Sequence, residues 1–183
     1  FGGAYFISNS PISINGLFVK DTDGVGVRIK YGHGAVTIKN GYVGFSKPFD
    51  IYDGIGLRIL GAGSLVGVVT LDNLRIYDNQ SDGILIANGG VVKLNNVYSS
   101  GNSGGYGLHL GDTDTPDSTK SLTINNSQLN WNYWGGVHAL VRGPVSITNT
   151  EISGNWGEDF NLEGDDAPGL YLDNRSLTGA AVT

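Results

Sequence analysis

A short segment recurs along nearly the whole chain, and it constrains the fold more than any other feature of the sequence. Each copy alternates apolar and polar residues and closes on an asparagine. The closing residues are Asn40, Asn73, Asn96, Asn126, Asn149 and Asn174, which are spaced 33, 23, 30, 23 and 25 residues apart. A period in the low twenties with occasional insertions predicts a solenoid, in which each repeat forms one coil stacked on the next.

Two further patterns accompany this repeat. In four copies a second asparagine follows six positions after the first, at Asn79, Asn102, Asn132 and Asn155. A stretch that begins with glycine precedes most copies, as in residues 83–86 and 107–110. Each unit therefore holds three short strands of alternating inward and outward residues, with glycine and asparagine at the corners.

Asparagine suits such corners for two reasons. It tolerates the left-handed backbone conformation that a sharp turn requires. Its side-chain amide both donates and accepts hydrogen bonds, so amides stacked on successive coils can bond to one another. We therefore expect all ten of these asparagines to form structural ladders along the solenoid.

These patterns predict an all-β protein, a single-stranded parallel β-helix (β-solenoid) of about six to seven coils with three short strands each. No segment has helical spacing, and the chain is rich in Val, Ile, Thr and Tyr, which favour strands. Residues 1–183 are predicted to form a single domain. The first, partial coil covers residues 1–23 and the last covers about residues 159–183.

The composition limits the partners. A net charge of −6 argues against a nucleic acid, which needs a basic face. No apolar run is long enough for a membrane span, and the lack of cysteine excludes disulfides and thiolate metal sites. The chain contains no methionine and its two ends are uncharged. We therefore expect a fragment of a longer β-helix or a processed subunit that stacks end to end on itself.

The repeat also resembles that of a known family. The combination of the glycine-led strand, the strand that closes on asparagine and the second asparagine is similar to the right-handed parallel β-helix repeat of pectate-lyase-like proteins. Residues 122–157 look especially like the β-helix repeats of large bacterial secreted and surface proteins. The resemblance implies a right-handed β-helix. It does not select a function, because that superfamily includes lyases, hydrolases, epimerases, adhesins and fibre proteins.

Outward columns are where chemistry is expected, since residues of one column stack on neighbouring coils. Aligned on the leading glycine, one column contains Gly26, Gly56, Leu85, His109, His138 and Asn161. The two histidines are predicted neighbours, either as a metal or acid/base pair or as two solvated surface residues. Arg28 and Arg58 also align, four residues after their glycines.

Two other groups of residues are candidate sites. Trp131, Tyr133, Trp134 and Trp156 form an aromatic cluster in the sequence that could stack on sugar rings, together with the two histidines, or could cover turns. Tyr133 and Trp156 each follow a second asparagine and are expected to be neighbours. Asp112, Asp114 and Asp117 lie in one long turn and could hold calcium weakly, or could form a solvated acidic loop. Calcium is the one cofactor considered.

The leading hypothesis is a structural or adhesive module of an extracellular or cell-surface protein, without catalysis, that could assemble end to end into a fibre. An alternative is a carbohydrate-active domain of the polysaccharide lyase or glycoside hydrolase type, with its site on the face of His109 and His138 beside residues 112–117. A further alternative is a glycan-binding module centred on Trp131, Trp134 and Trp156. A polysaccharide is accordingly a candidate partner.

Overall fold

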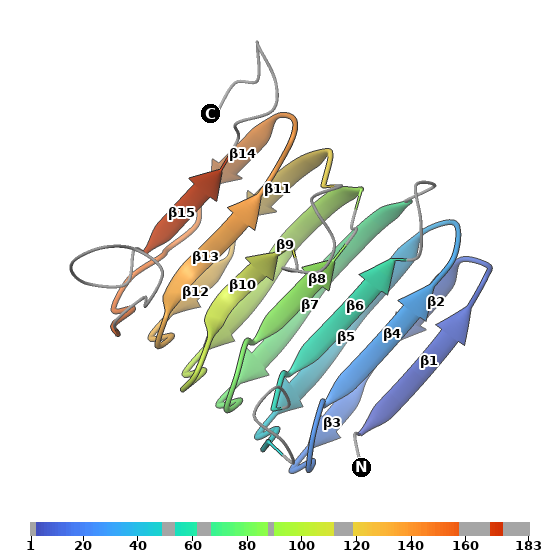
Figure 1. Cartoon of the computed structure of the whole chain (residues 1–183), viewed down its shortest axis with the longest axis horizontal. Helices are drawn as coiled ribbons and strands as arrows, with labels where there is room; N and C mark the ends of the chain where they lie inside the picture. Colours follow the sequence, from blue (N-terminus) through green and yellow to red (C-terminus); the bar gives the residue numbers. More distant parts are fainter. Residues whose placement is uncertain are drawn as a thin grey trace.

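Every regular element in the described part of the chain is a β-strand. The computed structural model describes residues 3–48, 54–61, 67–87, 90–111, 119–157 and 169–173. The strands pair in parallel with strands from the next coil, so they stack along one axis in the order shown by Figure 1. No helix in the described residues is long and apolar enough to cross a membrane.

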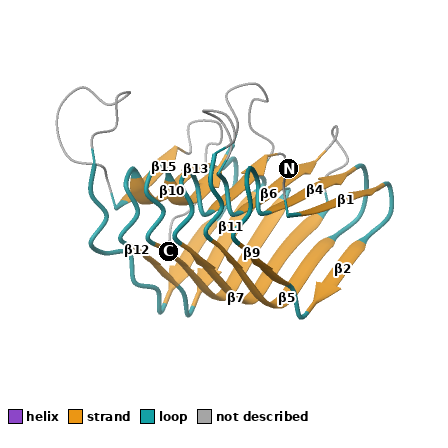
Figure 2. Cartoon of the chain, turned by 90° about the horizontal axis from the view of Figure 1, so that it is seen from below, coloured by secondary structure: helices purple, strands orange, loops and turns teal. Residues whose placement is uncertain are grey.

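The strands form two sheets, seen as two layers in Figure 2. The seven-stranded sheet contains, in spatial order, β1 (Ala4–Ser8), β4 (Val27–Tyr31), β6 (Leu57–Gly61), β8 (Ile84–Ala87), β10 (Tyr106–Leu110), β13 (Gly135–Leu140) and β15 (Leu170–Asp173). The eight-stranded sheet contains β14 (Val145–Thr148), β11 (Ser121–Asn125), β9 (Val91–Ser100), β7 (Val68–Tyr77), β5 (Val36–Gly44) and β2 (Ile12–Asn15), with β12 (Gln128–Asn130) paired to β9 and β3 (Phe18–Lys20) paired to β5.

The coils differ from the prediction in number and in strand count. The described chain winds about five turns, fewer than the predicted six to seven. The prediction counted the partial first unit and the last unit as coils, and of the last unit only β15 is described. Two of the three predicted strands are joined in β5, β7 and β9, because each of these strands runs through its corner asparagine and bends there.

The core lies between the two sheets and is built from columns of apolar residues. One column contains Val27, Leu57, Ile84, Leu108 and Val137, which follow one another in register and are all fully buried. The strict alternation of each strand places every second residue in such a column. Burial of one such side chain contributes about 2 kcal/mol to the free energy of unfolding, so the columns supply most of the stability.

The first set of asparagines stands at exposed corners. Asn40, Asn73, Asn96, Asn126 and Asn149 all have the left-handed backbone conformation, with φ between 49° and 54°. Side-chain amides of Asn40, Asn73 and Asn96 each donate to the Oδ1 of the preceding coil's asparagine, over 2.7–2.9 Å. The exposed ladder begins at Asn15, which accepts the hydrogen bond from Asn40.

The second set of asparagines forms a ladder inside the solenoid. Asn79, Asn102 and Asn132 are fully buried. The Oδ1 of Asn102 accepts both the backbone N–H and the side-chain amide of Asn79, at 3.2 and 2.9 Å. The same pattern joins Asn102 to Asn132 and Asn132 to Asn155. Ser46 takes the asparagine's place one coil earlier, with its N–H bonded to Asn79.

One of the predicted repeat copies belongs to the other sheet. The segment that leads to Asn174 reads as a copy of the strand that closes on asparagine, yet β15 pairs with β13 in the seven-stranded sheet. The carbonyl of Gly169 accepts the N–H groups of Gly136 and Val137, which places the segment in register with the strands led by glycine. Both patterns share the same alternation, and a glycine also stands directly before β7 and β9 of the other sheet, so the repeat pattern alone does not decide the sheet of this segment. Asn174 itself lies outside the described residues.

Candidate functional site

The outward face of the seven-stranded sheet carries one column of large polar and aromatic side chains. In register along the axis, its members are Tyr5, Arg28, Arg58, Leu85, His109, His138 and Tyr171. From β4 to β13 they alternate with fully buried core residues of the same strands, so their side chains project away from the core. We call this set the outward column.

The outward column differs from the predicted column at three positions, where the prediction had Gly26, Gly56 and Asn161. The prediction placed Gly26 and Gly56 beside Leu85, but the register brings Arg28 and Arg58 there. The stretches that begin at Gly24 and Gly54 each contain a second glycine, at position 26 or 56. These second glycines are the ones that stack in line with Gly83. A Cβ on Gly26 would lie 2.7 Å from the carbonyl oxygen of Gly56, so this position excludes a side chain.

At the far end of the outward column, the prediction placed Asn161 next to His138. Asn161 lies outside the described residues. The residue that pairs with His138 is Tyr171 of β15. The prediction had assigned this tyrosine's segment to the other sheet, so the aromatic end of the column was missed.

His109 is held by a carboxylate that the sequence analysis did not identify. Its Nδ1 lies 3.0 Å from Oδ2 of Asp82, and the other oxygen, Oδ1, accepts the backbone N–H of Tyr106 at 2.7 Å. The Asp82 side chain is only 8% exposed and that of His109 is 23% exposed. An imidazole whose Nδ1 faces a carboxylate is fixed in orientation, with the proton on Nδ1, so Nε2 becomes the nitrogen that can take part in chemistry.

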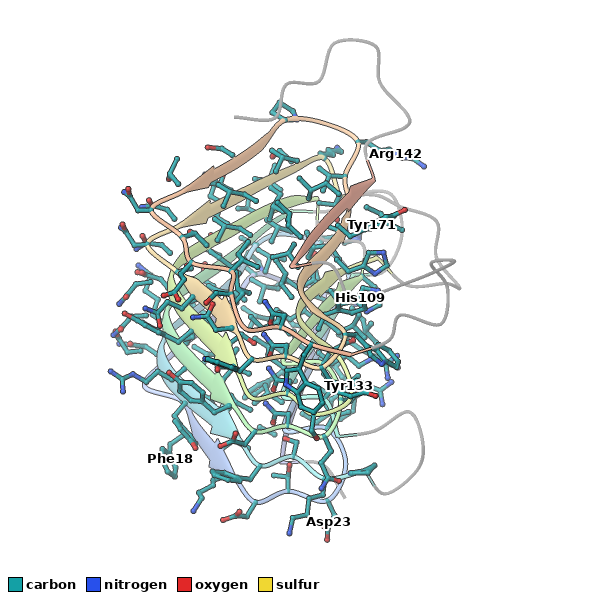
Figure 3. All side chains as sticks on the ribbon, turned by 90° about the vertical axis from the view of Figure 1, so that its left-hand side faces the viewer. Phe18, Asp23, His109, Tyr133, Arg142 and Tyr171 are labelled. Atoms are coloured by element: carbon teal, nitrogen blue, oxygen red, sulfur yellow. The ribbon has the colours of Figure 1, made fainter. Side chains whose placement is uncertain are left out.

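Five rings gather around this pair, and we call them the ring cluster: Tyr106, His109, Trp134, His138 and Tyr171. The two imidazoles stack with centroids 5.0 Å apart and an angle of 24° between their planes. Tyr106 contacts both histidines, at 5.2 and 4.8 Å, and Trp134 at 5.8 Å. Tyr171 lies 4.9 Å from His138. Figure 3 shows His109 and Tyr171 on the same side of the ribbon.

The other half of the outward column is cationic. Arg28 and Arg58 are register partners on adjacent coils, and the guanidinium of Arg28 lies 5.8 Å from the centre of the Tyr5 ring. Nε of Arg28 is buried and has no hydrogen-bond partner within the described residues. Between the arginines and the ring cluster, Leu85 packs with Val25 and Ile55 in a small apolar cluster.

The four aromatics singled out in the sequence separate into three places. Trp134 joins the ring cluster through Tyr106. Tyr133 and Trp156 contact each other edge to face at 5.2 Å, on neighbouring coils. Trp131 lies at a corner with φ of 58° and is 63% exposed, and its ring covers the backbone of Gly154. The aromatic cluster of the sequence is therefore not a single surface.

The predicted calcium site at Asp112, Asp114 and Asp117 lies outside the described residues. Among the residues that are described, no three histidine, cysteine, aspartate or glutamate side chains gather closely enough to hold a metal ion. The ring cluster and Asp82 together contribute two imidazoles and one carboxylate, which form the hydrogen-bonded Asp82–His109 pair with the His138 ring stacked on it.

Comparison with known proteins identifies the repeat. The family model described as the right-handed β-helix region matches residues 54–178, more than half of the chain. The match spans both the arginine of β6 and the ring cluster. No curated protein and no solved structure shows significant similarity to the chain.

Proposed function

The chain belongs to the right-handed β-helix family, and from that premise we propose that it is a β-solenoid module that binds an acidic polysaccharide along its outward column. The family match supports the β-solenoid. The ligand is inferred from the chemistry of one face, and the fold does not select it, because β-helices serve many functions.

The ring cluster is the observation that carries the proposal. A solenoid needs no more than small polar residues on its outward positions, yet three successive coils here carry four partly exposed rings that are linked by contacts with one another and with the buried Tyr106. Aromatic faces with polar edges stack on the apolar faces of sugar rings and bond to their hydroxyl groups. The cluster therefore suits a carbohydrate better than it suits a purely structural surface.

The arginines favour an acidic carbohydrate. Arg28 and Arg58 continue the same column toward β1, and guanidinium groups pair with carboxylates through two parallel hydrogen bonds. Successive coils are about 4.8 Å apart. A linear polymer that lies along the axis would therefore meet a cation or a ring at each coil, apart from the apolar coil of Leu85.

An adhesive role and a location outside the cell follow from the same proposal. A module that binds polysaccharide would act as an adhesive segment, and such ligands are found outside the cell, so we propose an extracellular or cell-surface location. The end-to-end fibre stays a prediction from the sequence, because no contact of the described residues tests it.

Tryptophan fluorescence tests the proposal directly. The chain has three tryptophans, so Trp131→Phe with Trp156→Phe leaves Trp134 as the only reporter, within the ring cluster. We expect hexagalacturonate to change the Trp134 emission and the uncharged maltohexaose to leave it unchanged. His138→Ala in this background should weaken binding about tenfold, since it removes the central ring of the cluster.

The matched control lies on the other sheet. Arg75→Gln removes an exposed cation from the eight-stranded sheet, and it should leave hexagalacturonate affinity unchanged, whereas Arg28→Gln should weaken it. An emission change that both hexasaccharides cause equally would contradict an acidic ligand. No change with either sugar at millimolar concentration would refute the proposal.

A second candidate function, polysaccharide cleavage, is favoured by the Asp82–His109 pair alone. A histidine that is fixed by a carboxylate through Nδ1 presents Nε2 as a general base. Nε2 could take the proton from the ring carbon that bears the sugar carboxylate. The bond to the leaving sugar oxygen then breaks, a double bond forms in the ring, and the imidazolium gives the proton to the leaving oxygen. This β-elimination needs no water and no oxidant.

Asp82→Asn separates binding from cleavage. The amide keeps the shape of the carboxylate but can hold the wrong tautomer of His109, so turnover should fall at least a hundredfold while affinity stays the same. The assay is ultraviolet absorbance of the unsaturated product from polygalacturonate, with reducing ends measured in parallel. If the wild type and Asp82→Asn form product at the same rate, the cleavage hypothesis is wrong, whereas the binding proposal is unaffected.

A further inference from the structure

The exposed asparagine ladder stops halfway along the solenoid. Side-chain amides are bonded in sequence from Asn96 to Asn73, Asn40 and Asn15. Asn126 and Asn149 have the same left-handed corner conformation. Within the described residues, however, the structure contains no hydrogen bond from either of these two side chains. The ladder therefore ends at Asn96 although the corners continue.

The sheet opens at the same point. β7 and β9 pair continuously across their corner, but β9 meets two separate strands on its other side, β11 and β12. Between them, the hydroxyl of Ser127 accepts the N–H of Val97 at 3.1 Å and donates to the carbonyl of Asn125 at 2.8 Å. Thr150 repeats this arrangement one coil later. A side-chain hydroxyl thus accepts one main-chain N–H at each of these two corners, while the N–H groups of Asn126 and Glu151 keep direct main-chain acceptors.

A shallow groove of about 630 Å³ lies where the ladder stops. It is lined by Asn96, Tyr98, Asn126, Ser127, Gln128, Asn149, Thr150 and Glu151. Tyr98 is only partly buried, and the guanidinium of Arg75 lies 5.8 Å from its ring centre. The volume is within the range of ordinary small-molecule sites. We call it the amide groove.

The lining of the amide groove matches an uncharged sugar. The amides of Asn126, Gln128 and Asn149 each offer donors and an acceptor, and none of them is engaged with another described residue. Glu151 is the only charged residue among the described lining, and its Oε1 accepts the hydroxyl of Ser153 at 2.7 Å. Amides in this number, next to one phenol ring, suit a ligand with many hydroxyls and no net charge.

We propose that the amide groove binds a neutral linear glycan, on a face separate from the ring cluster. Figure 3 shows Phe18, which begins the column that contains Tyr98, on the opposite side of the ribbon from His109 and Tyr171. The described lining of the amide groove contains one charged residue, Glu151, with Arg75 nearby, whereas the outward column carries two arginines and two histidines. One module would then hold an acidic chain on one side and a neutral chain on the other.

The same protein contains a natural control for this groove. A second hollow of about 420 Å³ is lined by Gly16, Leu17, Phe18, Asn40, Gly41, Tyr42, Asn73 and Arg75. It also has tyrosine and asparagine, but Asn40 and Asn73 are bonded to each other at 2.7 Å. Tyr42 is stacked on Phe18 at 5.3 Å. Because its amides are already engaged, this hollow should bind sugar far more weakly.

Side-chain amide signals report binding in the groove. In ¹⁵N-labelled full chain, we expect the NH₂ resonances of Asn126, Gln128 and Asn149 to shift on titration with cellohexaose, mannohexaose or chitohexaose. The resonances of Asn40 and Asn73 should not move. Tyr98→Ala should weaken binding about tenfold, whereas Tyr42→Ala should have no effect on it.

Asn126→Gly is a second test that does not depend on the folding of Tyr98→Ala. Glycine accepts the corner conformation, so this variant keeps the backbone and loses only the amide, and binding should weaken about threefold. The matched variant Asn73→Gly should bind like the wild type. No shift of the three amides with any of the hexasaccharides overturns the proposal, and so does an equal loss in Tyr98→Ala and Tyr42→Ala. Because hexagalacturonate binding to Trp134 is measured separately, failure of one face leaves the other standing.

Discussion

The two asparagine ladders contain the same residue at the same period, but asparagine serves a different purpose in each. Inside the solenoid, Asn102 is fully buried and its Oδ1 accepts two hydrogen bonds from Asn79. On the surface, Asn73 is exposed, has φ of 53° and makes single amide bonds to its neighbours. Burial, rather than residue type, therefore decides what a repeated asparagine contributes to stability.

In the buried ladder, the contribution is satisfaction of polar groups. The backbone N–H of Asn79 has no strand partner at this corner, and it finds its acceptor in the side chain of Asn102. A buried donor without an acceptor costs about 1–3 kcal/mol. The side-chain oxygen of each buried asparagine therefore satisfies both the backbone N–H and the side-chain amide of the asparagine in the previous coil.

In the exposed ladder, the contribution is mainly conformational. Water can replace the amide bond of Asn73 at little cost. The left-handed conformation, in contrast, costs about 1–2 kcal/mol for a residue with a Cβ, and asparagine reduces this cost by local hydrogen bonding. Its place in the exposed ladder is thus set by backbone geometry.

The largest effect is expected for Asn102→Ala. This change leaves the backbone N–H and the side-chain amide of Asn79 without their acceptor in a dry interior, and it removes the bond from Asn102 to Asn132. We expect a loss of about 4 kcal/mol in the free energy of unfolding, measured by urea denaturation. A loss below about 1 kcal/mol would mean that water enters the ladder, and the contrast between the two ladders would disappear.

Tyrosines extend the comparison to pH. Burial raises the pKa of Tyr31, inside the solenoid, to about 12, against about 10 for an unfolded tyrosine. Because the folded state holds this proton more tightly, stability is unaffected below about pH 10 and falls as the pH rises toward about 12. Tyr31→Phe should remove that fall, as measured by urea midpoints at several alkaline pH values.

Tyr77, on the outward side of β7, provides the control for this titration. Burial raises its pKa too, but it is only partly buried and the nearby Arg75 guanidinium acts in the opposite direction. Tyr77→Phe should therefore change the alkaline slope less than Tyr31→Phe does. Equal changes would show that the two sides of the sheet do not differ for tyrosine as they do for asparagine.

The repeat made most of the fold predictable from the sequence, for a physical reason. A coil must place apolar residues inward and a permissive residue at each corner, so the period, the parallel pairing and the family follow from local rules. Features that depend on how one coil lies on the next were harder to predict. Residues 24–27 contain two glycines that are required for different reasons: Gly24 has φ of 106°, whereas a Cβ on Gly26 would meet the carbonyl of Gly56 on the next coil.

The candidate sites were predictable only in part, for the same reason. His109 and His138 were expected to be neighbours, since both follow the repeat. Asp82 was not identified, because it stands at a corner before Gly83 and contacts His109 of the next coil. The break in the exposed ladder was also invisible, because Asn126 and Asn149 fit the pattern and only their missing partners distinguish them.

A moderate effect is expected for Asn73→Ala. Alanine must adopt the left-handed conformation without the help of a polar side chain, and two exposed amide bonds are lost. We expect a loss of about 1–2 kcal/mol, well below that of Asn102→Ala. A loss as large as that of Asn102→Ala would show that the exposed amide bonds are as strong as the buried ones.

The smallest effect is expected for Asn73→Gly, and it is the sharpest test of the comparison. Glycine adopts the left-handed conformation freely but lacks the amide, so it removes the ladder bonds and keeps the corner. If the corner conformation is what matters, stability should fall by less than about 1 kcal/mol, mainly through the greater entropy of unfolded glycine. The difference between the alanine and glycine variants then measures the conformational term by itself. If both variants lose the same amount, the amide bonds at 2.7 and 2.9 Å account for the effect, and the exposed ladder stabilises the solenoid in the same way as the buried one.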